Sequence, residues 1–144
     1  AYIRTFTAPF RTLGDIVHFS YNWYKESGSE ANVAPFFRYY YTNSLDELAA
    51  TEIGLLVYEP YHNFGDPVQD QWATSVVSDP AAKFWVRQYE PMERDLDSYL
   101  TLEEWFADDR LDIDSSTYVF AVDIGYVIGV TGITVFFSCT QGFI

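Results

Sequence analysis

The longest apolar run of the chain, residues 117–143 (TYVFAVDIGYVIGVTGITVFFSCTQGF), contains a single charged residue, Asp123. A helix of about 20 apolar residues is long enough to span a bilayer. The same length of chain also provides two buried β-strands. These two structures are incompatible, so the fold class of the whole chain depends on which of them forms.

The residue types in this run favour strands. Val, Ile, Thr, Tyr and Phe dominate it, and these side chains lose rotamer freedom in a helix but fit a pleated sheet. Gly125, Gly129 and Gly132 interrupt the run and indicate bends or bulges. Asp123 would be costly in lipid, and no Lys or Arg follows the run to anchor a helix. We therefore predict a strand pair, with a transmembrane helix at about 117–143 as the alternative.

Alternation within the run predicts which side chains share a face of each strand. The first strand would place four side chains together: Tyr118, Phe120, Val122 and Ile124. The second would do the same with Ile133, Val135 and Phe137.

Composition limits the class of protein. A length of 144 residues allows a single domain, 1–144, with its own core. The apolar content of 49% excludes a disordered polyanion. A net charge of −13 argues against strong direct binding of this chain to nucleic acid or to anionic lipid. The lone Cys139 cannot form an internal disulfide.

Several segments before residue 117 have the pattern of strands. The predicted strands are 15–24, 33–42, 53–58 and 83–89, with a short strand at 72–77. In the first, Val17, Phe19, Tyr21 and Trp23 alternate with polar residues. In the second, Phe37, Tyr39 and Tyr41 lie on one side, and Arg38 and Tyr40 lie on the other. The segment 53–58 (IGLLVY) is almost entirely apolar, as expected of a central strand.

Two capping boxes predict two short helices. Ser44 with Glu47 begins the first, over 44–50, and Thr101 with Glu104 begins the second, over 101–107. Strands and helices do not alternate as in βαβ units. The predicted fold is therefore all-β: an antiparallel β-sandwich with two short helices.

Five segments resemble picornavirus-like capsid proteins in their order and spacing. They are FRTLGDIV at 10–17, GLLVYEP at 54–60, FWVRQYEP at 84–91, VFAV at 119–122 and TVFFS at 134–138. Such proteins have a jelly-roll fold, so the resemblance implies a jelly roll over most of the chain. The earliest strands of a full jelly roll have no counterpart at the front. The implied jelly roll is incomplete, and a partner chain would complete its sheet, because an exposed sheet edge is prone to pair with another strand.

The resemblance implies a structural role and no enzymatic activity. The chain would be a capsid subunit that assembles with other capsid chains, as a homo- or hetero-oligomer, into an icosahedral shell around a genome. Its location would be the virion, assembled in the host cytoplasm. Such a role requires no catalytic residues, cofactor or metal. The candidate interface is a run of aromatic residues, which suit subunit contacts: Phe36, Phe37, Tyr39, Tyr40 and Tyr41. The alternative is that these residues are core and ordinary surface tyrosine.

Other functions remain as alternatives. The chain could be an accessory subunit of a membrane protein complex, anchored by a helix at about 117–143. It could also be a carbohydrate-binding β-sandwich that uses Trp23, Trp72, Trp85 or Trp105 to stack on sugars. The acidic residues between 95 and 114 predict a solvated face, with an interface calcium site as the alternative. Cys139 is expected to be a buried, inert thiol.

Overall fold

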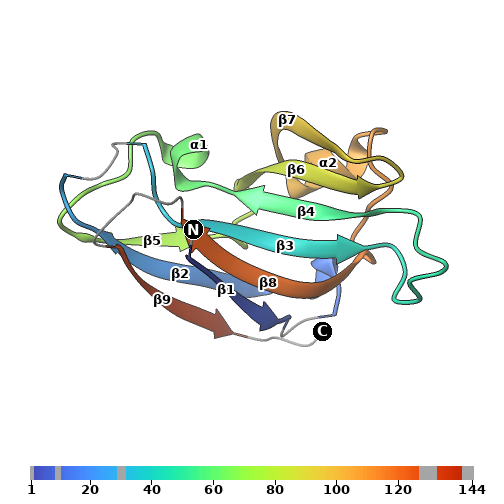
Figure 1. Cartoon of the computed structure of the whole chain (residues 1–144), viewed down its shortest axis with the longest axis horizontal. Helices are drawn as coiled ribbons and strands as arrows, with labels where there is room; N and C mark the ends of the chain where they lie inside the picture. Colours follow the sequence, from blue (N-terminus) through green and yellow to red (C-terminus); the bar gives the residue numbers. More distant parts are fainter. Residues whose placement is uncertain (1, 9–10, 29–31, 127–132, 141–144) are drawn as a thin grey trace.

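Two antiparallel β-sheets pack face to face in the computed structural model, which describes residues 2–8, 11–28, 32–126 and 133–140 (Figure 1). The six-stranded sheet has the order β1 (Tyr2–Thr7), β8 (Tyr118–Tyr126), β3 (Phe36–Thr42), β4 (Ile53–Tyr58), β6 (Lys83–Glu90) and β7 (Arg94–Thr101). The three-stranded sheet has the order β5 (Trp72–Val76), β2 (His18–Lys25) and β9 (Ile133–Thr140). The prediction of an all-β sandwich is confirmed.

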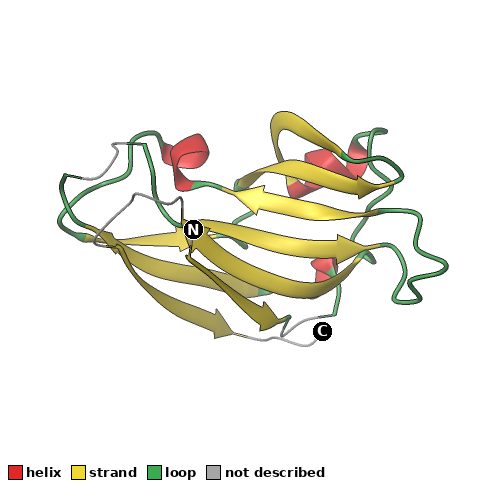
Figure 2. Ribbon diagram, in the orientation of Figure 1, coloured by secondary structure: helices red, strands yellow, loops and turns green. Residues whose placement is uncertain are grey.

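Helices are short and lie outside the two sheets (Figure 2). The described residues form two α-helices, α1 (Pro60–Phe64) and α2 (Leu102–Ala107), and a 3-10 turn, η1 (Leu13–Asp15). The capping box predicted for α2 is present, because the Thr101 side chain accepts a hydrogen bond from the Glu104 amide. Helix α1 is not one of the two helices predicted from the sequence, and Pro60 occupies its first turn.

The apolar run at the C-terminal end forms strands. β8 pairs with both β1 and β3, and β9 pairs with β2. The transmembrane helix at about 117–143 is therefore wrong, because the backbone groups of this run bond to neighbouring strands. Within the described ranges, no helix is both long and apolar enough to cross a membrane. Gly129 and Gly132, where bends were predicted, lie outside the described residues.

The connectivity is that of an incomplete jelly roll. Along the chain, the paired strands β3 and β4 lie between the paired strands β2 and β5. All four lie between the paired strands β1 and β8. Nested antiparallel pairs of this kind form one long hairpin, which rolls into two layers through the contacts β8–β3 and β9–β2. The hairpin β6–β7 is an insertion that extends the six-stranded sheet beyond β4. In the described part of the chain, β9 pairs with β2 alone, so the outermost pair of the roll is incomplete.

Aromatic side chains fill the space between the two sheets. The inner faces of β2 and β3 contribute Phe19, Tyr21, Trp23, Phe37, Tyr39 and Tyr41, all buried. The rings of Phe19 and Phe37 lie 4.8 Å apart, and those of Phe37 and Tyr39 lie 4.6 Å apart at a steep angle. Tyr21 donates its buried hydroxyl proton to the Pro35 carbonyl at 2.6 Å. Much of the high aromatic content is therefore core.

A bulge in β8 changes one predicted face. Tyr40 pairs with Ala121 and Tyr41 pairs with Val119, so Phe120 is an extra residue in the ladder. Val122 and Ile124 are buried on the predicted face, but Phe120 is 44% exposed and Val119 is buried in its place. Strict alternation fails here because one added residue reverses the faces on the far side of the bulge.

The helix predicted over 44–50 is absent, and this segment forms turns. The Ser44 hydroxyl accepts from the Asp46 amide, so it does not cap a helix. Leu45 and Leu48 are the large apolar residues of this segment, and both are exposed, Leu48 by 98%. A helix this short is stable only when its apolar face is packed, and these two leucines remain largely exposed.

Gly54 in β4 is expected to be intolerant of a side chain. An added Cβ would lie 2.6 Å from the Arg87 carbonyl oxygen and 2.6 Å from the Tyr41 hydroxyl. Replacing a strand glycine with alanine ordinarily stabilises a protein by roughly 0.5–1 kcal/mol. Here Gly54→Ala should instead destabilise it, by about 1–3 kcal/mol, because a backbone carbonyl cannot give way as a side chain can. Urea denaturation measures the difference.

The control for Gly54→Ala is the pair of variants Tyr41→Phe and Gly54→Ala/Tyr41→Phe. Removing the hydroxyl relieves one of three close contacts and leaves the Arg87 carbonyl and the Tyr41 ring carbon Cζ, at 2.8 Å, in place. The double variant should therefore recover only part of the loss relative to Tyr41→Phe. A Gly54→Ala variant more stable than wild type would contradict the packing described for this position.

Candidate functional site

The predicted aromatic interface lies on β3, and the alternation of the strand divides it. Phe37, Tyr39 and Tyr41 are buried between the sheets and cannot contact another molecule unless the sandwich opens. These three residues therefore belong to the core and not to an exposed interface. Phe36 and Tyr40 are half-buried on the outer face of the six-stranded sheet and remain candidates.

Arg38, Tyr40 and Asp123 form a charged network on this outer face. Arg38 donates from Nε to Asp123 Oδ1 at 2.8 Å and from Nη2 to Oδ2 at 2.5 Å. The Tyr40 hydroxyl donates to Oδ2 at 2.7 Å. Asp123 is fully buried beneath these partners, which explains how a carboxylate is accommodated in the apolar run.

The pKa of Tyr40 is raised to about 12, mainly by burial and then by the hydrogen bond to Asp123 and the charge of Asp123. The hydrogen bond to Asp123 is the main cause of the raised pKa of Arg38. Both side chains therefore keep their protons across the physiological range. Neither Tyr40 nor Arg38 is therefore poised for acid–base catalysis near neutral pH.

Trp85 and Arg87 on β6 continue the outer face. The Arg87 guanidinium lies 5.6 Å from the centre of the Trp85 ring, and it forms a two-bond ion pair with Asp95. Between β3 and β6, Leu55 and Val57 of β4 are buried under these side chains. We use the name outer patch for the half-buried residues of this face: Phe36, Arg38, Tyr40, Trp85 and Arg87.

A second cluster lies at the end of β4, around Glu59. Trp85 donates from Nε1 to Glu59 Oε2 at 2.9 Å, and His62 Nε2 lies 3.3 Å from the same oxygen. The His62 ring stacks on Tyr99 with a centroid distance of 4.0 Å. Next to this cluster is a cavity of about 290 Å³ whose lining includes Glu59, Tyr61, His62 and Phe36. This site was not predicted, because its residues come from β3, α1, β6 and β7.

The acidic residues between 95 and 114 do not converge. Asp108 is held by Arg110, whose hydrogen bonds lower the pKa of Asp108 to about 2. Asp95 is paired with Arg87. In the part of the chain that the structure describes, no three His, Cys, Asp or Glu residues are arranged to hold a metal ion. The described residues therefore give no support to the calcium alternative.

Glu52 is a buried carboxylate that the sequence did not reveal. It accepts two hydrogen bonds from Gln88 Nε2, at 3.0 and 2.9 Å, and one from the Asp112 amide at 2.9 Å. The Tyr41 hydroxyl donates to it at 3.3 Å. Gln88 in turn accepts from Arg94 Nε at 2.6 Å. This network fastens the loop before β8 to β4, β6 and β7, so its role is structural.

The raised pKa of Glu52 predicts a pH dependence of stability. Burial is the main cause of the rise, and the hydrogen bonds oppose it. A carboxyl group whose folded pKa is above its unfolded value makes the fold less stable as the pH rises from the unfolded value, about 4.3, through the folded one. Glu52→Gln removes this titration. The stability of the variant relative to wild type should therefore increase over that interval and become constant above it.

Urea titrations of wild type and Glu52→Gln at matched pH values give this difference directly. Glu47→Gln is the matched control, since it makes the same exchange at an exposed glutamate of the β3–β4 connection. A relative stability of Glu52→Gln that falls with rising pH would contradict the assignment.

Two of the four tryptophans proposed as sugar platforms are inaccessible. Trp23 and Trp105 are buried, whereas Trp72 is 57% exposed and Trp85 is half-buried in the outer patch. Trp72 packs edge-on against Tyr24 at 5.7 Å. The backbone of Cys139 pairs with Phe19 in the three-stranded sheet.

No protein-family model matches the chain, and no curated protein or solved structure is significantly similar to it. The resemblance to picornavirus-like capsid proteins therefore stays a prediction. What the chain does must be inferred from its fold and its surface.

Proposed function

We propose that this chain is a structural subunit of a virus capsid, which packs beside other capsid chains in an icosahedral shell around a genome. The observation that carries the proposal is the nested connectivity of β1–β8, β2–β5 and β3–β4. This is the jelly-roll arrangement that capsid subunits use. Its location would be the virion, with assembly in the host cytoplasm.

The outer patch supports a role in lateral packing. It presents aromatic rings and guanidinium groups on the outer face of the sheet. On the same face, Leu55 and Val57 are buried beneath them. Aromatic residues and arginine are the residue types enriched in the cores of protein interfaces. The acidity of the chain, −13, assigns genome contact to other chains or segments.

The test is the mass and shape of the native assembly. Material from the natural source is examined by light scattering and by negative-stain microscopy, and recombinant chain is examined alone and with its co-purifying partners. Closed shells of uniform diameter that contain this chain are the expected result. A strict monomer with no counterpart in particles would exclude a capsid role.

A further inference from the structure

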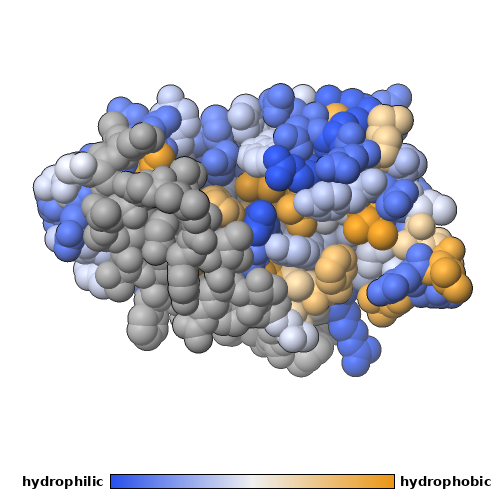
Figure 3. All heavy atoms as spheres, viewed as in Figure 1, coloured by the Kyte–Doolittle hydropathy of each residue, from blue (hydrophilic) through white to orange (hydrophobic). Residues whose placement is uncertain are grey.

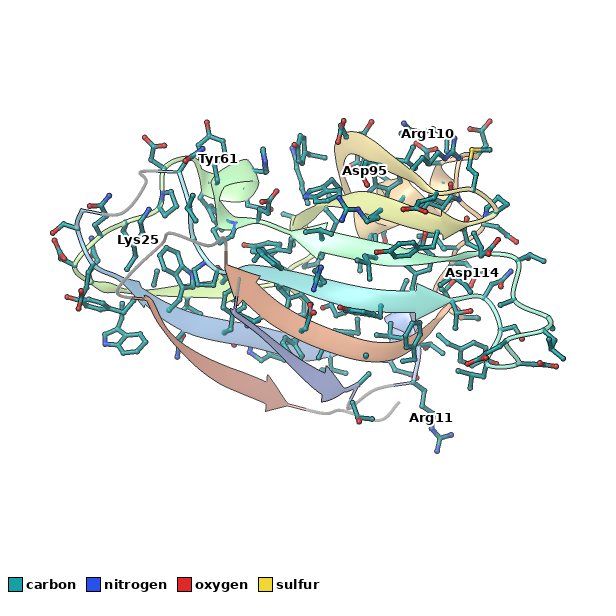
Figure 4. The ribbon with its side chains drawn as sticks, viewed as in Figure 1. Arg11, Lys25, Tyr61, Asp95, Arg110 and Asp114 are labelled. Carbon is teal, nitrogen blue, oxygen red and sulfur yellow. The ribbon has the colours of Figure 1, made fainter. Side chains whose placement is uncertain are left out.

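Arg11 is a cation without a partner among the residues that the structure describes. The other arginine side chains that the structure describes donate to oxygens within the molecule: Arg38, Arg87, Arg94 and Arg110. Arg11 is exposed, and its side chain forms no hydrogen bond or ion pair with any described residue. Figure 4 shows this side chain projecting from the molecule into solvent. In a chain with 21 acidic and only 8 basic residues, such a free cation is unusual.

The cavity beside Glu59 has the chemistry to bind a guanidinium group. Glu59 uses Oε2 for Trp85 and His62, and Oε1 accepts no hydrogen bond from a described residue. Tyr61 and Phe36 line the same cavity, and the Phe36 ring already has the Arg38 guanidinium 5.2 Å from its centre. An arginine side chain stacks on aromatic rings and pairs with a carboxylate, and both interactions are available here at once.

The two sites cannot meet within one molecule. Arg11 and Tyr61 project from opposite corners of the sandwich in Figure 4. A contact between them therefore joins two copies head to tail, with Arg11 of one copy in the cavity of the next. Such a heterologous contact generates a ring when the rotation closes, which is the kind of contact that a shell needs.

We propose that Arg11 of one copy binds in the Glu59 cavity of a neighbouring copy and that this contact sets the lateral packing of the subunits. The inference rests on the proposed function, because it assumes that copies of the chain pack side by side in a shell. The two residues themselves are chosen for their charge and their positions. The net acidity of each copy opposes association, so a specific cation–carboxylate contact has a large effect on whether two copies approach.

Charge reversal tests the contact. Sedimentation velocity is measured for wild type, Arg11→Glu, Glu59→Arg and the double variant Arg11→Glu/Glu59→Arg. Each single variant places like charges together and should weaken self-association by about tenfold or more. The double variant restores opposite charges and should return to within about threefold of wild type. Lys83→Glu, at another exposed basic residue, is the matched control and should not affect association beyond its change in net charge.

The outcomes separate this inference from the proposed function. Shells or oligomers that form equally well with Arg11→Glu would overturn the inference and leave the capsid role in place. A double variant that remains as weak as the single ones would also overturn it, because the two residues would then have different partners. Arg11 is exposed, so Arg11→Glu tests the contact even where Glu59→Arg disturbs Trp85. A wild-type chain that never associates would reject both proposals.

Discussion

Asp123→Ala is expected to lower the free energy of unfolding by about 3 kcal/mol, the lower end of the range for breaking a buried ion pair. The substitution leaves Arg38, whose side chain is only 17% exposed, without its carboxylate. It also removes the acceptor of the Tyr40 hydroxyl. The lower end of the range applies because Arg38 retains some contact with water. Urea denaturation at neutral pH gives the value.

Asp95→Ala is the matched control for this prediction. Arg87 and Asp95 form an ion pair of the same geometry on the same sheet, but their side chains are 42% and 43% exposed. An exposed pair contributes about 0–1 kcal/mol, so Asp95→Ala should have a much smaller effect than Asp123→Ala. Equal losses in the two variants would show that Asp123 is not buried as described.

Replacing both members of the buried pair separates charge from packing. Arg38→Leu/Asp123→Leu removes the carboxylate and the guanidinium together and leaves apolar side chains. Exchanges of this kind are often close to neutral. We therefore expect the double variant to be clearly more stable than Asp123→Ala. A double variant that is as unstable as Asp123→Ala would mean that shape, not charge, dominates at this site.

The strands that sequence patterns located are those with a locally visible alternation. The segments 33–42, 53–58 and 83–89 correspond closely to β3, β4 and β6. Strand β7 was missed because its sequence, RDLDSYLT, is mostly polar: Leu96 is its one buried residue, and Leu100 is only partly buried. It is an edge strand whose existence depends on hydrogen bonds to β6, and such bonds leave no trace in the local pattern.

The faces of a strand can be separated from sequence, but the identity of the core face cannot. Alternation grouped Phe37, Tyr39 and Tyr41 apart from Arg38 and Tyr40, and the structure has the same grouping. Both groups contain aromatic residues, so aromatic content alone did not show which one faces the second sheet. The predicted interface therefore combined core and surface residues.

The polar networks depend on strand register, which local sequence patterns do not show. Arg38 and Asp123 are 85 residues apart in the chain and meet because β3 pairs directly with β8. Glu52 and Gln88 are 36 residues apart and meet through the pairing of β4 with β6. A lone charge in an apolar run, such as Asp123, does signal that a partner exists. It does not say which residue the partner is.

Trp105→Ala is expected to lower the free energy of unfolding by about 3–5 kcal/mol, the range for deleting a large buried aromatic side chain. Trp105 is fully buried, and it is the one residue of α2 that is. Its indole Nε1 donates to the Phe84 carbonyl oxygen at 2.8 Å. The substitution leaves a cavity against β6 and removes the partner of a buried carbonyl, and both effects are unfavourable.

Two further variants divide the effect of Trp105 between packing, hydrogen bonding and helix formation. Trp105→Phe keeps an aromatic ring but loses the donor to Phe84, so its loss should be smaller than that of Trp105→Ala. Thr101→Ala removes the cap of α2 and leaves the ring in place, and it should cost about 1 kcal/mol. This order follows because a helix of six residues has little stability of its own. If Thr101→Ala were the most damaging of the three, α2 would be held by its cap and not by Trp105.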